Sequence, residues 1–357
     1  MPSAVDAGTS SRELPVRNNP DIESFDIVET YNRLLAEDPD LIKSLAAIEA
    51  MIEALRHVSS TTVHETMDLM KAQSAKLQSS VTNPIAVYHG TDLFQQYFLK
   101  QLKQPGPDRE TTSSHRNFEV VREQLLRNGT AFVQKAKRAR ETIAWVGRRF
   151  IRDNYTILTH GGSRAVGTLL ERATESHGGD PPRRFNVIYV IDETKPTESN
   201  RMVEALRAKG VKVATIPVSA VAYAMEKVDR VILGAEAVAS NGGVISRMGT
   251  YQIALIAKAH NKELFVAAEQ YKFGDTFPEN QSRLGFPGFK QNIISFRSSR
   301  SQGQASEDTC QAPSDPVDYT PPEFITSFFT DQGDLTPQAV ARNILDFIVD
   351  KPVDLPM

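Results

Sequence analysis

The segment T-I-L-T-H-G-G-S-R-A-V-G-T-L-L, residues 156–170, joins a β-rich run to a helical pattern through two glycines. A strand that passes through a glycine turn into a helix is the repeating unit of a parallel sheet. The glycines let backbone N–H groups approach an anion, and Ser163 and Arg164 can donate hydrogen bonds to phosphate oxygens. Glycines after a strand equally serve a tight turn and close packing of helix on sheet. A binding loop and a purely structural turn therefore both stay open at this point.

Similar β-rich runs and helical patterns alternate along the following part of the chain. The runs cover 155–159, 185–191, 211–216, 230–234 and 263–267, and the helical patterns cover 163–176, 198–209, 218–227 and 246–260. Because this alternation requires right-handed crossovers, it predicts a doubly wound α/β fold, in which helices cover both faces of a parallel sheet. A last strand is expected over 324–329. A closing helix is expected from Thr336 and Pro337 to about Val349, since Thr is a good N-cap and Pro suits a first helical turn.

The N-terminal part of the chain has a helical pattern instead. Over 41–55, apolar residues recur at three- and four-residue spacing, as one face of an α-helix requires. Further helices are expected at about 58–80, 91–103 and 113–152. Residues 1–20 are polar and have no periodicity, which predicts a disordered leader. We therefore predict a helical N-terminal domain over 21–150, followed by the α/β domain over 151–357.

A stretch rich in Ser, Gln, Pro and charged residues interrupts the second domain at about 281–318. Such a composition cannot bury enough apolar surface to order itself, so it predicts a mobile surface insertion. Cys310 lies there, which makes it a poor candidate nucleophile. As the only cysteine it excludes a disulfide within the chain and is typical of a reducing compartment, so the cytosol is expected.

The overall composition excludes several classes of protein. A formal net charge of -3 argues against a dedicated nucleic-acid binder. No apolar run reaches the length of roughly 18 to 20 residues that a membrane helix needs, and the N-terminus lacks the apolar core of a signal peptide. Neither G-x-G-x-x-G nor a P-loop follows an expected strand, which disfavours nicotinamide cofactors and triphosphates. Because His64-Glu65 lacks the second histidine of a zincin helix, no metal site is expected.

Side chains that follow the expected strands are candidates for acid–base chemistry. His160 ends the first strand, where a general base and a packed structural histidine are both open readings. Glu236 and Glu269 end two other strands and would act as acid or base if burial raised their pKa values. The basic run K-A-K-R-A-R at 135–140 is expected to be a solvated helix face.

Three further motifs carry a resemblance to a known family. They are G-A-E-A-V-A-S-N-G-G-V-I-S-R-M-G-T-Y-Q at 234–252, T-H-x-x-S-R at 159–164 and V-A-A-E-Q-Y-K-F at 266–273. These motifs resemble the shared domain of the regulatory subunits of eukaryotic translation initiation factor 2B and of their sugar-phosphate isomerase relatives. E-D-P-D-L at 37–41, with the motif beginning D-Y-T-P-P at 318, resembles the alpha type of subunit. The resemblance covers about 22–349, without most of the insertion.

The resemblance implies a helical domain followed by a Rossmann-like domain that dimerises. It implies a non-catalytic subunit whose homodimer joins two beta-gamma-delta-epsilon assemblies of the factor that exchanges GDP for GTP on initiation factor 2. It also implies a role in sensing the phosphorylated alpha subunit of initiation factor 2. We nominate Glu37, Asp38, Glu49 and Glu53 as part of that partner surface, against the alternative of an ordinary solvated face.

The isomerase relatives use a cysteine after the T-H pair and an aspartate in a G-A-D segment. This chain has Gly161 and Glu236 at those positions. The glycine removes a catalytic group, so we expect no isomerase activity but a surviving anion-binding architecture. An active isomerase of a phosphorylated ribose and a free-standing metabolite-binding dimer remain as alternatives.

If the loops after the strands meet in one cavity, that cavity is expected to bind a sugar phosphate or a nucleoside monophosphate without converting it. The candidate lining residues are Gly161, Gly162, Ser163, Arg164, Glu193, Glu236, Asn241, Gly242 and Lys272, with Lys71 from the helical domain closing over the phosphate. Apolar side chains of the last strand offer either a dimer contact or simple core: Phe324, Ile325, Phe328 and Phe329.

Overall fold

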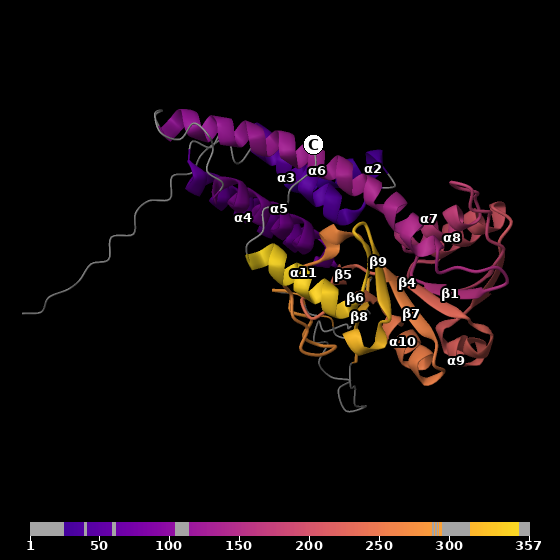
Figure 1. Ribbon diagram of the computed structural model, residues 1–357. Helices are drawn as coiled ribbons and strands as arrows, with labels where there is room; N and C mark the ends of the chain where they lie inside the picture. Colours follow the sequence, from indigo (N-terminus) through magenta and orange to yellow (C-terminus); the bar gives the residue numbers. More distant parts are fainter. Residues whose placement is uncertain are drawn as a thin grey trace, which may run out of the picture.

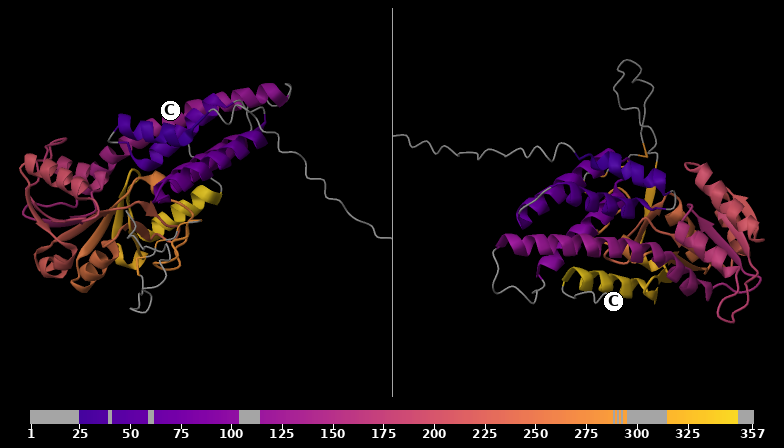
Figure 2. Two further views of the ribbon diagram at one scale, coloured as in Figure 1. Left: turned by 180° about the vertical axis from the view of Figure 1, so that it is seen from behind. Right: turned by 90° about the horizontal axis from the view of Figure 1, so that it is seen from above.

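The computed structural model describes residues 25–38, 41–58, 62–103, 114–287, 289, 291, 293–294 and 315–349. The N-terminal part of this structure is helical, and the following part is a sheet flanked by helices (Figure 1). Two further views place the N-terminal helices to one side of the sheet (Figure 2). The leader expected over 1–20 lies outside the described residues, and so does Cys310. No helix in the described ranges is long and apolar enough to cross a membrane.

The helical region is built around α3, whose apolar face is the one expected from the sequence. Its helices are α2 (Ile27–Glu37), α3 (Lys43–His57), α4 (Val63–Ser80), α5 (Ile85–Lys103) and α6 (Ser114–Arg148). Leu45, Ile48 and Leu55 of α3 are almost fully buried in one core with the neighbouring helices. Helix α5 begins earlier than expected, because the Asn83 side chain accepts the backbone N–H of Ile85 at 3.1 Å.

Helix α6 joins the two parts of the molecule. It extends from the helical region to the side of the sheet where α7 (Arg164–Ala173) lies (Figure 1). Near its end, Ile143 and Ala144 pack in the core of the sheet. Gly147 lies so close to Leu169 and Phe329 that an added side chain would collide with them. The helical region and the sheet are therefore held together by a continuous element.

The main sheet has seven strands in the order β10-β9-β7-β4-β1-β2-β3. The strands are β1 (Thr156–His160), β2 (Asn186–Val190), β3 (Lys212–Ile216), β4 (Arg230–Gly234), β7 (Glu263–Ala267), β9 (Ser327–Thr330) and β10 (Gly333–Leu335). The paired neighbours are parallel except β10, which runs antiparallel to β9.

In the buried strands of the main sheet, successive residues face opposite cores, as the pleat of a sheet requires. Ile157 packs with α6, α7 and α8 (Pro196–Ala208), whereas Leu158 packs with α9 (Val221–Ala224), α10 (Thr250–Ala259) and α11 (Pro337–Val349). Helices thus cover both faces of a mostly parallel sheet, which confirms the doubly wound α/β fold.

A second, three-stranded antiparallel sheet was not expected. It consists of β5 (Ala237–Val238), β6 (Val244–Arg247) and β8 (Val317–Thr320), in the order β5-β6-β8. The helix expected over 246–260 begins only at Thr250, because β6 takes up the preceding residues and Gly249 turns the chain with φ +101°. Asp318 of β8 then accepts the backbone N–H groups of Gly249 and Tyr251 at 2.7 and 3.0 Å.

The C-terminal elements also differ in detail from the expectation. In place of the strand expected over 324–329, the chain forms a 3-10 turn at Pro322–Phe324 and then β9. Earlier in the chain, the helix expected over 218–227 is replaced by the short α9 between two 3-10 turns. Phe328 and Phe329 are fully buried on opposite faces of the sheet and Ile325 is buried as well, so they form core and are not free for a dimer contact. Helix α11 starts as expected, with Thr336 Oγ1 accepting the N–H of Ala339 at 3.2 Å.

Both ends of the stretch expected as a mobile insertion over 281–318 are packed against each other in the structure. Leu284 and Phe286 are buried with Val317 and Tyr319 in a small core beside the second sheet. The side chain of Gln281 exchanges hydrogen bonds of 2.7 and 2.8 Å with the backbone of Tyr319. Apolar side chains and glutamine amides thus tie down flanks that the composition alone suggested were mobile, while residues 295–314 lie outside the described residues.

Burial of His89 in α5 predicts a pH dependence of stability. Burial lowers the pKa of His89 to about 4. Because an unfolded histidine binds its proton near pH 6.5, lowering the pH between these values favours the unfolded chain. Between pH 7 and pH 5, wild type is expected to lose about 2 kcal/mol of unfolding free energy relative to His89→Leu in urea titrations. Parallel pH profiles for the two proteins would contradict this reading.

Asp92 and Asp318 act in the opposite direction. Burial raises the pKa of Asp92 to about 6 and that of Asp318 to about 7. Each carboxyl group binds its proton more tightly in the folded chain, so each adds stability as the pH falls through these values. Both groups are present in wild type and in His89→Leu, so the difference between the two proteins isolates the histidine.

Candidate functional site

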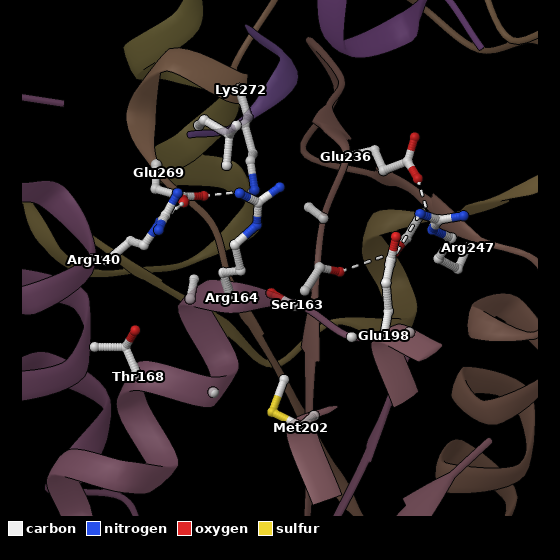
Figure 3. Close-up of a pocket in the computed structure, with 18 of the residues that line it drawn as sticks. Arg140, Ser163, Arg164, Thr168, Glu198, Met202, Glu236, Arg247, Glu269 and Lys272 are labelled. Atoms are coloured by element: carbon white, nitrogen blue, oxygen red, sulfur yellow. Dashed lines mark hydrogen bonds and ion pairs between the residues drawn. The ribbon is translucent and has the colours of Figure 1, made fainter. Parts of the chain in front are cut away.

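A cavity of about 600 Å³ lies where the carboxyl ends of β1, β4 and β7 meet the helical region (Figure 3). Ligands of open α/β sheets bind at this edge, where strands lead into helix N-termini. The main sheet lines the cavity with the loop 161–164, with 234–236 and with Glu269 and Lys272. The remaining lining residues with polar side chains are Lys43, Ser44, Asn83, Arg140, His160, Thr168, Glu171, Glu198, Arg201, Ser246 and Arg247.

The glycine turn after β1 is both a tight turn and part of the cavity wall. Gly161 and Gly162 have φ angles of +79° and +63°, which favour glycine. The N–H of Gly162 donates to the Tyr189 hydroxyl at 3.0 Å. Ser163 begins α7 as its N-cap, and Arg164 donates to the carbonyl oxygen of Leu41 at 2.9 Å. The loop therefore fixes the helical region to the sheet while it lines the cavity.

Cationic side chains surround the buried carboxylate of Glu269 at one side of the cavity. Lys272 Nζ lies 2.6 Å from Glu269 Oε2 and Arg140 Nε lies 3.6 Å from Oε1 (Figure 3). Burial by itself raises the pKa of Glu269, but the cations outweigh it, and the net shift is downward. The sequence analysis made a role of Glu269 as acid or base conditional on a pKa raised by burial, and that condition is not met. With Arg164 also in the lining, cations outnumber this carboxylate.

Carboxylates surround Arg247 at the other side of the cavity. Its guanidinium lies 3.1 Å from Glu236, 3.5 Å from Glu198 and 2.8 Å from Asp315, and its side chain is 12% exposed. Glu236 also accepts from the Asn83 amide at 2.8 Å. The Glu236 carboxylate is therefore held between two donors.

The sequence left the role of His160 open, and the structure favours the packed histidine. The ring is buried, with Nδ1 3.0 Å from the carbonyl oxygen of Val190 and Nε2 3.0 Å from that of Met248. Both nitrogens thus face main-chain oxygens, and the ring links β1, β2 and the turn after β6.

The structure brings most of the candidate binding residues together but not all. Gly161, Gly162, Ser163, Arg164, Glu236 and Lys272 line the cavity, whereas Lys71, Glu193, Asn241 and Gly242 do not. Lys71 is exposed on α4, and Glu193 is exposed in the turn before α8. Asn241 and Gly242 form the turn between β5 and β6, where Asn241 donates to the Tyr319 hydroxyl at 2.7 Å. Ligand binding by the lining residues stays a prediction.

Several charged lining residues were missed by the sequence analysis. Arg140 was included in a solvated basic face, although it lies four residues after Ala136 and three before Ile143, which are both buried. That helical spacing was a usable signal. Arg247 and Lys43 gave no comparable signal, because their carboxylate partner Asp315 lies far away in the sequence.

The four acidic residues nominated for partner binding gather around two cations. Arg33 contacts Glu37 at 3.0 Å and Glu53 at 2.8 Å. Lys137 contacts Asp38 at 3.7 Å and Glu49 at 3.2 Å. These pairs lie across α2, α3 and α6, and their four carboxylates outnumber the two cations. Lys137, which the sequence placed in a solvated basic helix face, is therefore ion-paired. Partner binding by this surface is untested.

The decisive comparison comes from a protein-family model. The model of the initiation factor 2 subunit family matches residues 37–337. The chain belongs to the initiation factor 2 subunit family. Within this family, translation initiation factor eIF2B subunit alpha of Dictyostelium discoideum is 32% identical over 332 residues, which cover 90% of this chain and 97% of the relative.

An enzyme and a solved structure resemble this family member in different ways. Ribose 1,5-bisphosphate isomerase of Archaeoglobus fulgidus is 35% identical over 161 residues, which cover 45% of this chain and 49% of the enzyme. A chain of the tetrameric eIF2B-beta2-delta2 complex from C. thermophilum superposes with a TM-score of 0.66 at 16% identity, covering 92% of this chain and 97% of that chain. This likeness supports the fold.

Within the described ranges, no group of three or more His, Cys, Asp or Glu side chains could hold a metal ion.

Proposed function

We propose that the chain is a non-catalytic regulatory subunit, of the alpha type, of the guanine-nucleotide exchange factor for initiation factor 2. The observation that carries this proposal is its similarity to an eIF2B subunit alpha over 97% of that relative's length, against 49% for the isomerase. Its partners would be the beta, gamma, delta and epsilon subunits in the cytosol, and its homodimer would bridge two such assemblies.

The geometry around Gly161 supports a role without catalysis. A Cβ atom at this position would lie 3.1 Å from Cγ of Arg247, and the φ angle of +79° adds strain for any other residue. The space next to the turn is thus taken by an arginine, and the Glu236 carboxylate is paired with it. Incubation of the purified protein with ribose 1,5-bisphosphate or methylthioribose 1-phosphate is expected to give no isomerised product, and turnover would favour the enzyme alternative.

The acidic surface around Arg33 and Lys137 is the proposed contact for initiation factor 2 with a phosphorylated alpha subunit. Neutralising its carboxylates with Glu37→Gln, Asp38→Asn, Glu49→Gln and Glu53→Gln keeps side-chain size while it removes charge. In an exchange assay with all five subunits, this variant is expected to weaken the inhibition caused by phosphorylated initiation factor 2 but not basal exchange. Unchanged inhibition would remove the surface from the proposal.

We further propose that the cavity binds a sugar phosphate or a nucleoside monophosphate without converting it. A volume of about 600 Å³ suits a small metabolite. On one side, Arg140 and Lys272 contact the buried carboxylate of Glu269, and Arg164 lines the cavity as well. A phosphate bound there would touch groups from α6, the glycine turn and the β7 end. Because it would join these parts of the chain, the ligand would stabilise the folded protein by linkage.

Lys272 and Lys71 provide a matched pair for this proposal. Lys272→Met is expected to weaken ribose 5-phosphate binding about tenfold or more, because it removes a charged donor. Lys71→Met is expected to leave affinity unchanged, because Lys71 is exposed outside the cavity. Isothermal titration calorimetry on the full chain measures both, and equal losses, or no heat for any phosphorylated sugar or nucleotide at millimolar concentration, would contradict the assignment.

A further inference from the structure

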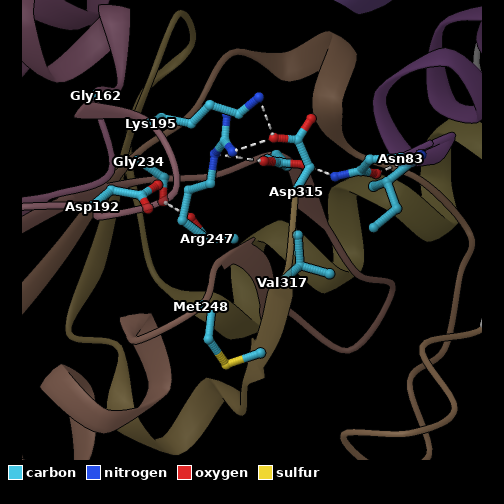
Figure 4. Close-up of polar contacts among 12 residues, drawn as sticks. Asn83, Gly162, Asp192, Lys195, Gly234, Arg247, Met248, Asp315 and Val317 are labelled. Carbon is cyan, nitrogen blue, oxygen red and sulfur yellow. Dashed lines mark hydrogen bonds and ion pairs between the residues drawn. The ribbon is translucent and has the colours of Figure 1, made fainter. Parts of the chain in front are cut away.

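One buried carboxylate is surrounded by cations from three separate parts of the fold. Asp315 Oδ1 lies 2.9 Å from Lys195 Nζ and 2.8 Å from Arg247 Nη1 (Figure 4). Asp315 Oδ2 lies 3.2 Å from Lys43 Nζ. The Asp315 side chain is 6% exposed. Lys43 starts α3 of the helical region, Lys195 precedes α8 of the main sheet, and Arg247 ends β6 of the second sheet.

The charge arrangement around Asp315 is that of an occupied anion site. Burial by itself raises the pKa of Asp315, but Lys195, Lys43 and Arg247 outweigh it and lower the pKa to about 2, so the carboxylate is ionised at neutral pH. Without this carboxylate, three cationic side chains would converge on one point, and Arg247 would keep Glu198 and Glu236 as partners. Cations that converge from several elements form an anion site when they exceed the carboxylates beside them.

We propose that Lys43, Lys195 and Arg247 form a second anion site, which Asp315 occupies as a built-in ligand. This site accepts a phosphate or another small oxyanion when Asp315 is absent from it. Lys43 and Arg247 also line the cavity, whereas Lys195 does not. The second site is therefore contiguous with the cavity but distinct from the Lys272 side.

The occupied second site has a consequence for ligand choice, which rests on the proposed function of the cavity. At this side Arg247 faces Glu198, Glu236 and Asp315, so its charge is already balanced. At the other side, Lys272 and Arg140 both contact the one carboxylate of Glu269. With Asp315 in place, the cavity thus accepts one phosphoryl group, at the Lys272 side, and repels a second one at the Arg247 side.

Removing the built-in ligand tests the second site directly. The variants are Asp315→Ala, and Asp315→Asn, which keeps the shape and loses the charge. Thermal unfolding of the full chain is followed at constant ionic strength, with and without inorganic phosphate at about 20 mM, a concentration suited to a weak anion site. Both variants are expected to melt below wild type and to gain more from phosphate than wild type does. The matched control, Asp334→Ala, removes an exposed partner of Arg149 and is expected to respond to phosphate as wild type does.

A double variant identifies the cations responsible. Asp315→Asn with Lys195→Met is expected to lose the additional stabilisation by phosphate, because Lys195 belongs to the second site and not to the cavity lining. If the Asp315 variants respond to phosphate no more than wild type and Asp334→Ala, the cluster is a structural ion network and the proposal is wrong. The same holds if the additional response survives the loss of Lys195.

Calorimetry separates this proposal from that of the cavity itself. Asp315→Asn is expected to bind ribose 1,5-bisphosphate about tenfold more tightly than wild type, with ribose 5-phosphate affinity changed much less. If wild type binds neither sugar, the proposed cavity ligand fails while the response to inorganic phosphate still tests the second site. An equal change for both sugars would overturn the restriction to one phosphoryl group.

Discussion

Replacing Arg247 by alanine is expected to lower the free energy of unfolding by about 3 to 5 kcal/mol. The guanidinium is largely buried and lies within 3.5 Å of three carboxylates. Its removal would leave Glu236 with the Asn83 amide and Asp315 with two lysines, in a place where water replaces the lost charge poorly. Urea unfolding followed by circular dichroism measures the change.

Arg149 supplies the matched control for this prediction. Its guanidinium lies 3.6 Å from Asp334, and the two side chains are 64% and 49% exposed. An exposed ion pair contributes about 0 to 1 kcal/mol, so Arg149→Ala is expected to be nearly neutral. A similar loss for both arginine variants would show that the contacts of Arg247 carry no special weight.

Replacing Gly242 by alanine is expected to cost about 2 to 5 kcal/mol of unfolding free energy. Gly242 has a φ of +79°, which is strained for alanine. A Cβ atom there would also collide with the backbone carbonyl of Pro337, at the start of α11. The turn between β5 and β6 thus needs glycine for packing against α11, and it lies outside the lining of the cavity.

Gly178 separates the two causes of the Gly242 effect. It has a φ of +55° and nothing within 4 Å of the position of an added Cβ. Gly178→Ala therefore reports backbone strain alone and is expected to cost about 1 kcal/mol. If Gly242→Ala and Gly178→Ala prove equally destabilising in thermal or urea unfolding, close approach of Pro337 is not the reason for the glycine.

Most strands of the main sheet could be predicted from the sequence because they are local apolar runs that alternate with helices. The three-residue strand β10 was not expected. The second sheet could not, because β5 has only two residues and β6 pairs with β8, which lies beyond residues 295–314. Side chains in such short strands are held by distant partners, and a local pattern does not identify those partners. The misplaced start of α10 follows from the same cause, since β6 and Gly249 precede it.

The candidate site was predictable to the extent that it follows strand ends. Gly161, Ser163, Glu236 and Lys272 belong to the segments that follow β1, β4 and β7, and they line the cavity. Arg140 comes from a helix of the other part of the chain, and the pairing of Arg247 with Asp315 joins the ends of two distant strands. Contacts of that kind depend on the assembled fold: helical spacing can indicate that Arg140 faces the interior, but it does not identify the carboxylate that Arg140 contacts.

Affinity purification of the full chain from its native cell tests the central claim most directly. The bound proteins are identified by mass spectrometry, with a matched purification from cells that lack the tagged chain as control. Membership in the exchange factor predicts recovery of the beta, gamma, delta and epsilon subunits together with initiation factor 2. Recovery of the chain as a dimer without those four subunits, under conditions that keep the complex of the other subunits intact, would contradict it.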